Sequence, residues 1–140
     1  MARSSVGVER TPDGRRVCVS RPIDAPAGTV WDLLTDTRRW PEWGPTVSDV
    51  DCPDRYVTAG SRGRVRVLRG PWVPFEVTTC QADAPVRRWT WDVAWVPATG
   101  HRVTGSRPCR VVFEVPLLGV AYLPVCERAL VRIERPSANN

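Results

Sequence analysis

Residues 23–36 read IDAPAGTVWDLLTD, and this segment contains the first turn and the first helix that the sequence predicts. Pro26 suits the first turn of a helix, because a proline lacks the N–H that would have no intrahelical partner there. The apolar residues that follow share one helical face: Val30, Trp31, Leu33 and Leu34. We therefore expect a helix over residues 27–35, with Trp31 buried between it and a sheet.

The flanks of this segment predict a strand before it and a second short element after it. Residues 16–24 alternate Val17, Val19 and Ile23 with more polar neighbours, which is typical of a half-buried strand. Residues 36–45 place Trp40 and Trp43 three apart around a proline. We interpret them as a short helix or a tight turn held by two indoles.

The middle of the chain carries repeated short strand signals. Strands are expected over residues 46–52, 61–68, 72–80, 87–96, 101–104 and 109–115, separated by turns such as residues 97–100. Such regular spacing predicts an antiparallel meander. The strongest of these strands is 87–96, where Trp89, Trp91 and Trp95 fall on one face.

The last segment has helical periodicity. Between Pro124 and Pro136, apolar residues recur at helical spacing, among them Cys126 and Leu130. The order of elements predicts an α+β helix-grip fold: a curved antiparallel sheet of six or seven strands wrapped on a C-terminal helix, with two short helices after the first strand. Curling of such a sheet leaves space for a ligand cavity unless side chains fill it.

Two motifs resemble the opening of a known superfamily. IDAPAGTVWDLLTD and the following RWPEW (residues 39–43) are similar to the SRPBCC superfamily, also called START or Bet v 1-like, and to its polyketide cyclase/dehydrase-type branch. The resemblance extends over about residues 17–135 in the order of elements. It implies a helix-grip fold with a deep apolar cavity. Pro116, Gly119 and Pro124 interrupt the region before the last helix, so we expect a short lid or an irregular flap there.

The indoles of the strongest strand define the expected cavity. If their face is concave, a planar ligand would stack on them, and if no space remains they are core. The expected ligand-binding residues are Trp89, Trp91, Trp95, Phe75, Phe113, Tyr122, Cys126 and Leu130.

His101 is the only histidine of the chain. Its unperturbed pKa lies near neutrality, so it is the candidate general base if a reaction takes place in the cavity. The alternative interpretation is a hydrogen-bonded structural histidine.

Composition narrows the function classes. All 20 basic residues are arginines, spread along a chain of net charge +5, so no dense basic patch predicts nucleic-acid binding. The five scattered cysteines have no metal-ligand spacing, and no nucleotide-binding motif is present, so we expect neither metal nor cofactor. With no apolar run long enough to span a membrane and no export signal, we expect a cytoplasmic protein.

The length of 140 residues predicts a single domain, with residues 1–14 and 136–140 flexible.

Three hypotheses for the function of the protein follow from the sequence. The first is a carrier or sensor of a small hydrophobic, ring-bearing molecule. The second is a cyclase/dehydrase-like enzyme that acts in the same cavity. The third, a nucleic-acid or protein interaction module, would use the arginine face of Arg62, Arg64 and Arg66. The sequence leaves the oligomeric state open.

Overall fold

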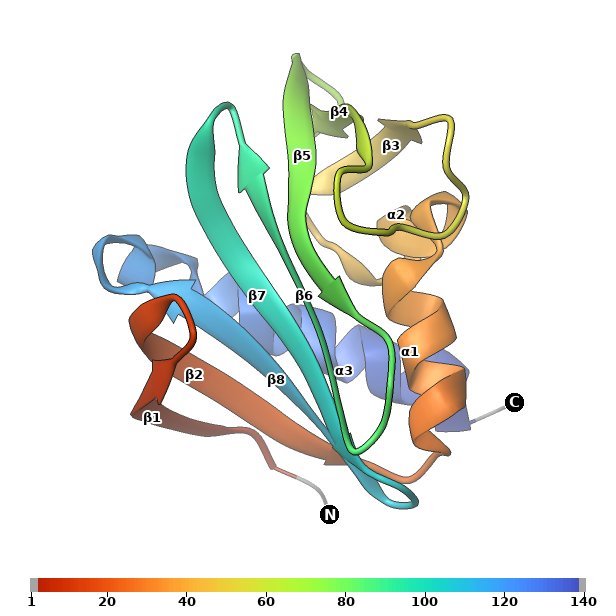
Figure 1. The fold of residues 1–140 in the computed structure, drawn as a ribbon, viewed down its shortest axis with the longest axis vertical. Coiled ribbons are helices and arrows are strands. Elements are labelled where there is room, and N and C mark those ends of the chain that lie inside the picture. The colour runs from red at the N-terminus through yellow and green to blue at the C-terminus, as the bar shows by residue number, and fades with distance from the viewer. Residues whose placement is uncertain (1–2, 139–140) are drawn as a thin grey trace.

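The computed structural model describes residues 3–138, without the side chains of residue 118 and residues 136–138. One antiparallel sheet of eight strands, in the order β1-β2-β8-β7-β6-β5-β4-β3, curves around a C-terminal helix (Figure 1). The strands are β1 Ser5–Thr11, β2 Gly14–Ile23, β3 Val47–Asp51, β4 Arg62–Val67, β5 Trp72–Gln81, β6 Val86–Val93, β7 Val96–Gly105 and β8 Cys109–Pro116. The helices are α1 Ala27–Thr35, η1 Thr37–Arg39, α2 Trp40–Trp43, η2 Leu117–Tyr122 and α3 Leu123–Ala138. The helix-grip architecture is confirmed, with eight strands instead of six or seven.

The additional strand lies in the segment that the sequence analysis expected to be flexible. β1 pairs with β2 along its whole length, from Ser5 opposite Ser20 to Thr11 opposite Gly14. Pro12-Asp13-Gly14 closes this hairpin, with Gly14 at a φ of +105° that favours glycine. Proline-aspartate-glycine is a common turn sequence, and here it marks the hairpin. At the other end, α3 continues to Ala138, beyond the stop expected at Pro136, and residues 139–140 lie outside the described residues.

The helix of the opening motif forms where expected. Its buried positions include Val30, Trp31 and Leu34, which confirms the burial of Trp31. The two indoles of α2 donate hydrogen bonds to the last turn of α1: Trp40 Nε1 to the carbonyl of Leu34 at 2.9 Å, and Trp43 Nε1 to that of Leu33 at 3.1 Å. These bonds satisfy carbonyls that have no partner within the helix, so α2 also caps α1.

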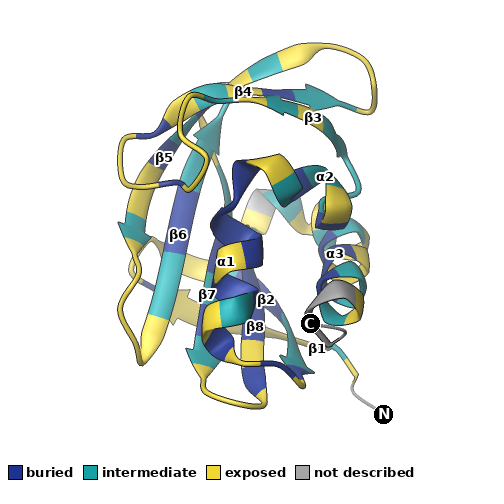
Figure 2. Cartoon of the chain, turned by 90° about the vertical axis from the view of Figure 1, so that its right-hand side faces the viewer, coloured by how far each residue is buried: buried dark blue, intermediate teal, exposed yellow. Residues whose placement is uncertain are grey.

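The three α-helices all lie on the concave side of the sheet. Figure 2 shows α1, α2 and α3 within the curve of the sheet, facing the inner surface of the strands. Val19, Val111 and Phe113 on the sheet and Leu130 and Ile133 on α3 are fully or almost fully buried. Among the described residues, no helix has the length and apolar character needed to cross a membrane.

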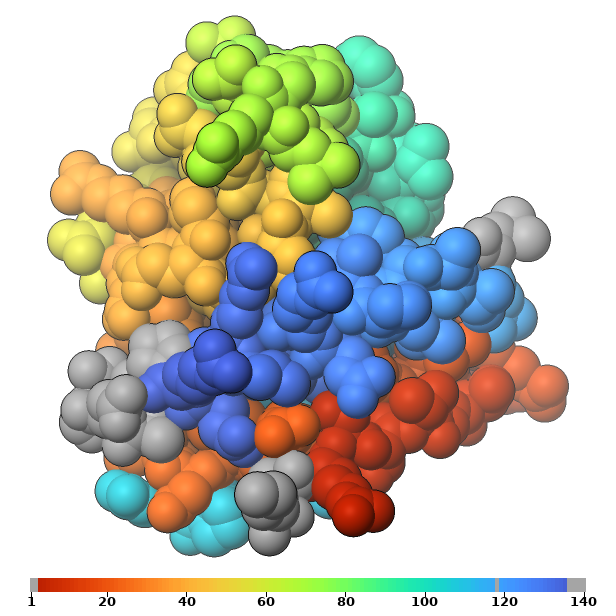
Figure 3. Space-filling model, turned by 180° about the vertical axis from the view of Figure 1, so that it is seen from behind, coloured from red at the N-terminus to blue at the C-terminus, as the bar shows by residue number. Residues whose placement is uncertain are grey.

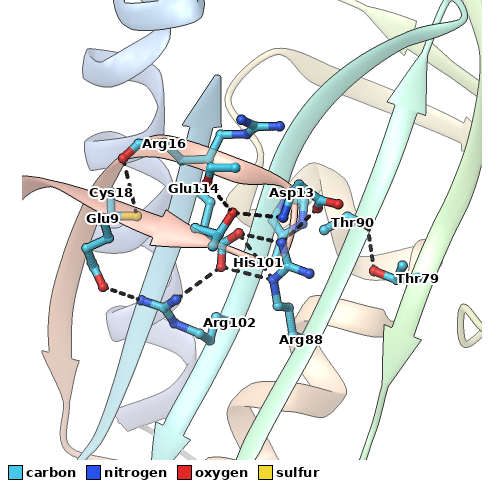
Figure 4. A network of polar contacts seen from close by, with 12 residues as sticks. Glu9, Asp13, Arg16, Cys18, Thr79, Arg88, Thr90, His101, Arg102 and Glu114 are labelled. Carbon is cyan, nitrogen blue, oxygen red and sulfur yellow. Dashed lines mark hydrogen bonds and ion pairs between the residues drawn. The ribbon is translucent and has the colours of Figure 1, made fainter. Parts of the chain in front are cut away.

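A charged cluster holds the β1–β2 hairpin to the convex side. Glu114, only 1% exposed, accepts hydrogen bonds from Arg88 at 2.7 Å and Arg102 at 3.2 Å (Figure 4). The same arginines pair with the hairpin, Arg88 with Asp13 at 2.8 Å and Arg102 with Glu9 at 3.2 Å. We call these five residues the Glu114 cluster. Glu114 alternates with the inward-facing Phe113 and Val115, so it points away from α3.

Candidate functional site

A stack of three flat rings fills the inner end of the space between sheet and helices. The indoles of Trp40 and Trp89 lie parallel, with centroids 5.3 Å apart and 3° between their planes. The imidazole of His101 stacks on the other side of Trp89 at 3.9 Å and 18°. All three residues are at most 2% exposed. This stack, Trp40–Trp89–His101, occupies volume that would otherwise belong to a central cavity.

Other aromatic rings surround the stack. Phe75 packs on Trp40 at 5.3 Å, and Phe113 meets the edge of His101 at 5.2 Å. Trp91 lies beside the stack, 5.3 Å from Trp40 in an edge-on arrangement. Because aromatic edges and faces attract each other, this cluster is a rigid floor for whatever lies next to it.

The main pocket lies beside this floor. It has a volume of about 740 Å³, and Trp91 is its one aromatic indole wall. Aliphatic side chains from β3, β4, β6, β7 and β8 dominate the remainder, and η2 closes one side. Its lining residues are Arg15, Arg16, Thr46, Val47, Val65, Val67, Trp91, Val93, Val96, Pro97, Ala98, Thr99, Val115, Pro116, Leu117, Gly119 and Tyr122. A volume of this size is within the range of small-molecule sites.

The outer wall of the pocket is exposed. Val96 of β7 and Leu117 of η2, which both line it, are about half exposed or more, so the pocket opens to solvent at these two elements. Figure 3 shows η2 (light blue) continuing into α3 (blue) across this side of the molecule, with the β6–β7 turn (teal) next to it.

A much smaller cavity of about 40 Å³ lies further in, against the ring stack. Its walls include Trp43, Trp89, Phe113 and Cys126. Five residues line both spaces, which are therefore contiguous: Thr46, Val47, Trp91, Thr99 and Tyr122. The hydroxyls of Thr46 and Tyr122 are 2.7 Å apart and form a hydrogen bond at this boundary.

Both ring nitrogens of His101 are occupied. Trp91 Nε1 donates to Thr99 Oγ1 at 3.2 Å, so the Thr99 hydroxyl is free to donate to His101 Nε2 at 3.0 Å. The Nδ1–H of His101 then donates to the carbonyl of Trp89 at 3.2 Å. Burial lowers the pKa of His101 from 6.5 to about 3. The imidazole is therefore neutral at pH 7, and its lone pair is engaged.

The Cys126 thiol and the Tyr122 hydroxyl are also held in their neutral forms. Burial raises the pKa of the Cys126 thiol to about 12, and it raises that of the Tyr122 hydroxyl above its ordinary value. Trp89 Nε1 is buried without a hydrogen-bond partner. Among the described residues, no three His, Cys, Asp or Glu side chains converge to hold a metal ion.

The structure separates the expected cavity residues into three groups. Trp91 and Tyr122 line the main pocket and the small cavity, whereas Trp89, Phe113, Cys126 and His101 line the small cavity alone. Phe75 and Leu130 are buried in the core and line neither space.

Trp95 lines neither space and is not in the core either, so its expected place on the indole face is wrong. β6 ends at Val93, and Ala94 and Trp95 form the β6–β7 turn with φ values of +51° and +64°. The side chain of Trp95 is 85% exposed as a result. The turn expected at residues 97–100 is instead part of β7.

Several lining residues were missed by sequence reasoning. Trp40 and Trp43 were interpreted only as structural, although both line the small cavity. Thr99 was missed because residues 97–100 were expected to form a turn, whereas they belong to β7. Val65 and Val67 could have been found, because they alternate with arginines in a recognised strand. Arg15, at the start of β2, carried no recognisable signal.

Comparison with known proteins agrees with this architecture. Residues 15–132 match the family model of polyketide cyclase/dehydrase and lipid transport proteins. No curated protein matches the sequence significantly. A hypothetical protein from Helicobacter pylori, jhp0584, has a TM-score of 0.68 at 11% identity, over 98% of this chain and 88% of its own.

Two further solved structures of similar fold carry functional names. The di-domain ARO/CYC protein StfQ of the steffimycin biosynthetic pathway has a TM-score of 0.62 at 14% identity, over 86% of this chain and 44% of its own. A norcoclaurine synthase from Thalictrum flavum has a TM-score of 0.55 at 10% identity, over 98% and 97%. Identities this low show the fold alone. The family match covers most of the chain, and the chain therefore belongs to the polyketide cyclase/dehydrase and lipid transport family of the SRPBCC superfamily.

Proposed function

We propose that this protein binds a small hydrophobic, ring-bearing molecule in the main pocket, as a carrier or sensor. The observation that supports it most is the pocket of about 740 Å³ beside the aromatic floor, with Trp91 as its indole wall. The lining contains no acidic residue and is mostly aliphatic. Burial of an apolar ligand there would contribute roughly 25 cal/mol per Å² of apolar surface removed from water.

The polar groups favour binding over chemistry. A general base needs a free lone pair and a pKa near the working pH. His101 has neither, since Thr99 occupies its Nε2 and burial lowers its pKa to about 3. The high pKa of Cys126 keeps its thiol protonated, so it is not a nucleophile at neutral pH. We therefore assign His101 a structural role.

A cyclase/dehydrase-like enzyme is the second candidate. It is supported by the name of the family and by the hydroxyls of Thr46, Thr99 and Tyr122, which gather where the two spaces meet. The Thr99 proton is donated to His101, but Thr46 and Tyr122 share one hydrogen bond, which leaves one of their two hydroxyl protons for a ligand carbonyl. Turnover of a polyketide substrate that disappears in a Tyr122→Phe variant, with binding retained, would establish this alternative.

The experiment for the binding proposal uses a neutral planar probe. N-phenyl-1-naphthylamine should bind with enhanced probe fluorescence, and Trp91→Ala should weaken its binding by about 1–3 kcal/mol through lost stacking and area. Trp95→Ala is the matched control, because that indole is exposed in a turn and should leave the affinity unchanged. Equal affinities of the wild type and both variants would exclude Trp91 from the site. Native mass spectrometry of protein taken from its host would identify the natural ligand.

The expected cytoplasmic location is part of this proposal. All five cysteines are free thiols in the structure, as befits a protein of a reducing compartment.

A further inference from the structure

The β1–β2 hairpin separates its charges between the two faces of the sheet. Its acidic residues Glu9 and Asp13 are drawn to the convex side, where Arg102 and Arg88 pair with them (Figure 4). Arg15 alternates with Arg16 and shares the parity of Val17, which is buried on the concave side. Arg15 is therefore directed to the side where the main pocket opens, and it is one of the residues that line it.

A second arginine reinforces this charge. Arg10 of β1 lies directly opposite Arg15 in the hairpin register, and opposite residues of antiparallel strands project on the same face. Like charges in that position repel each other. In the part of the chain that the structure describes, neither guanidinium has an acidic partner.

Arg16, between Arg15 and Val17, lies opposite Glu9 in the hairpin register, so alternation directs its side chain to the convex face with that acid. It also lines the main pocket, and its Nη1 donates only to the backbone carbonyl of Arg15, at 2.9 Å. The pocket thus has an aliphatic and indole interior and a basic rim at the hairpin, with no carboxylate among its lining residues. A purely apolar ligand would leave this local repulsion in place, whereas an anionic group at the rim would relieve it.

We propose that the ligand is an amphipathic carboxylate, whose apolar body lies against Trp91 and whose carboxylate is bound by Arg15 and Arg10 at the pocket rim. This inference rests on the proposed binding function and adds the chemical class of the ligand. Arginine suits the role, because its planar fork donates two parallel hydrogen bonds to a carboxylate.

The test is competition against bound N-phenyl-1-naphthylamine by two ligands of equal chain length, dodecanoate and dodecan-1-ol. We expect dodecanoate to displace the probe at a concentration at least about fivefold lower, from the added charge-assisted hydrogen bonds. Added salt should reduce this preference, because the rim is exposed and its charges are screened. The double variant Arg10→Gln/Arg15→Gln should bind both competitors equally.

The control variant is Arg128→Gln. It removes a positive charge from an exposed position of α3 that does not line the pocket, so the preference for dodecanoate should persist. Equal displacement by the two competitors in the wild type, or a preference that survives the double variant, would overturn the carboxylate assignment while leaving the binding function intact. Failure of the probe and of both competitors to bind would overturn the binding function and this inference together.

Discussion

His101 has a defined hydrogen-bonding direction. The sequence of donors runs from Trp91 Nε1 to Thr99 Oγ1 and from the Thr99 hydroxyl to Nε2, which leaves the proton of the imidazole on Nδ1, bonded to the carbonyl of Trp89. If Nε2 were also protonated, the Thr99 hydroxyl would have to rotate its own proton away from Nε2 before its oxygen could accept the new hydrogen bond. The side chain of His101 is also only 2% exposed, so water could not solvate a positive charge on the ring.

We predict that folding stability falls as the pH is lowered below 6.5. The unfolded chain takes up a proton at its histidine near pH 6.5, whereas the folded protein does so only near pH 3. Between these values the unfolded state binds more protons, so the free energy of unfolding should decrease by roughly 2 kcal/mol from pH 6.5 to pH 5 from this group. Denaturant titrations at both pH values should show this decrease in the free energy of unfolding for the wild type and not for the His101→Gln variant.

The protonation state of His101 can also be followed directly by NMR in the wild-type protein. The proton resonances of the imidazole should show no titration between pH 8 and pH 5 in the folded protein. A midpoint near 6.5 would mean that the ring is accessible to solvent and available as a base.

The pattern of the sequence was informative for single residues only where the backbone stayed regular. Alternation placed Trp89 and Trp91 on the concave side, because β6 continues as one strand through both, even though its pairing with β7 shifts register at Trp91. It failed for Trp95, because the chain turns at Ala94 with a positive φ that a non-glycine residue seldom adopts and that no turn motif announced. The partners of His101 were likewise not predictable, since they depend on the pairing of β6 with β7.

At the scale of elements, the β1–β2 hairpin depends on the Glu114 cluster. Glu114 reaches its two arginines over Gly100, directly opposite it on β7. A Cβ at position 100 would lie 2.7 Å from Glu114 Oε1, so a larger residue there would force the carboxylate out of its present position. Two of the cluster's charges come from the hairpin, which is thereby tied to β6 and β7 as well as to its neighbour β8.

We predict that Glu114→Gln destabilises the fold by roughly 3 kcal/mol. The substitution preserves shape but leaves Arg88 and Arg102, which are largely buried, without their shared counter-charge. Asp24→Asn is the matched control, because its ion pair with Arg107 is exposed and should contribute less than about 1 kcal/mol. Chemical denaturation of the two variants measures the difference, and equal values would show that the cluster is not energetically coupled.

Element prediction succeeded where local signals were strong. The helix of residues 27–35 and the last helix have clear apolar faces, and both form. β1 was missed, because Val6 and Val8 remain exposed on an edge strand and give only a weak alternation signal. Its formation is fixed instead by hydrogen bonding to β2 and by the cluster on the far side, which are contacts that the local sequence does not display.

At the scale of the molecule, the ring stack displaces the binding space. The family resemblance implied a deep central cavity, but Trp40 and Trp89 close the inner end, and the main pocket lies toward β3, β4 and η2. The existence of a pocket followed from the order of elements. Its position did not, because it depends on how α2 places Trp40 against β6.

We predict no tight binding to nucleic acid. The arginines are dispersed over the molecule, and eight of them are engaged in ion pairs within the described residues. Few phosphates could therefore be neutralised together. Gel shifts with random duplex DNA at about 150 mM salt should show no complex at micromolar protein, and a submicromolar Kd with steep salt dependence would contradict this prediction.

Because Trp40 stacks parallel to Trp89, a small flat molecule should be able to stabilise a variant that lacks the Trp40 side chain. Trp40→Ala should cost about 3–5 kcal/mol and leave a flat void next to Trp89, with the Leu34 carbonyl missing its donor. Free indole has the shape and the N–H to refill that void, and binding to the folded state alone would raise the melting temperature in proportion to its occupancy. Trp72→Ala, which removes a partly exposed indole, should gain nothing from added indole. Free indole would then replace the deleted side chain as a bound ligand, and folding of the Trp40→Ala variant would depend on the indole concentration.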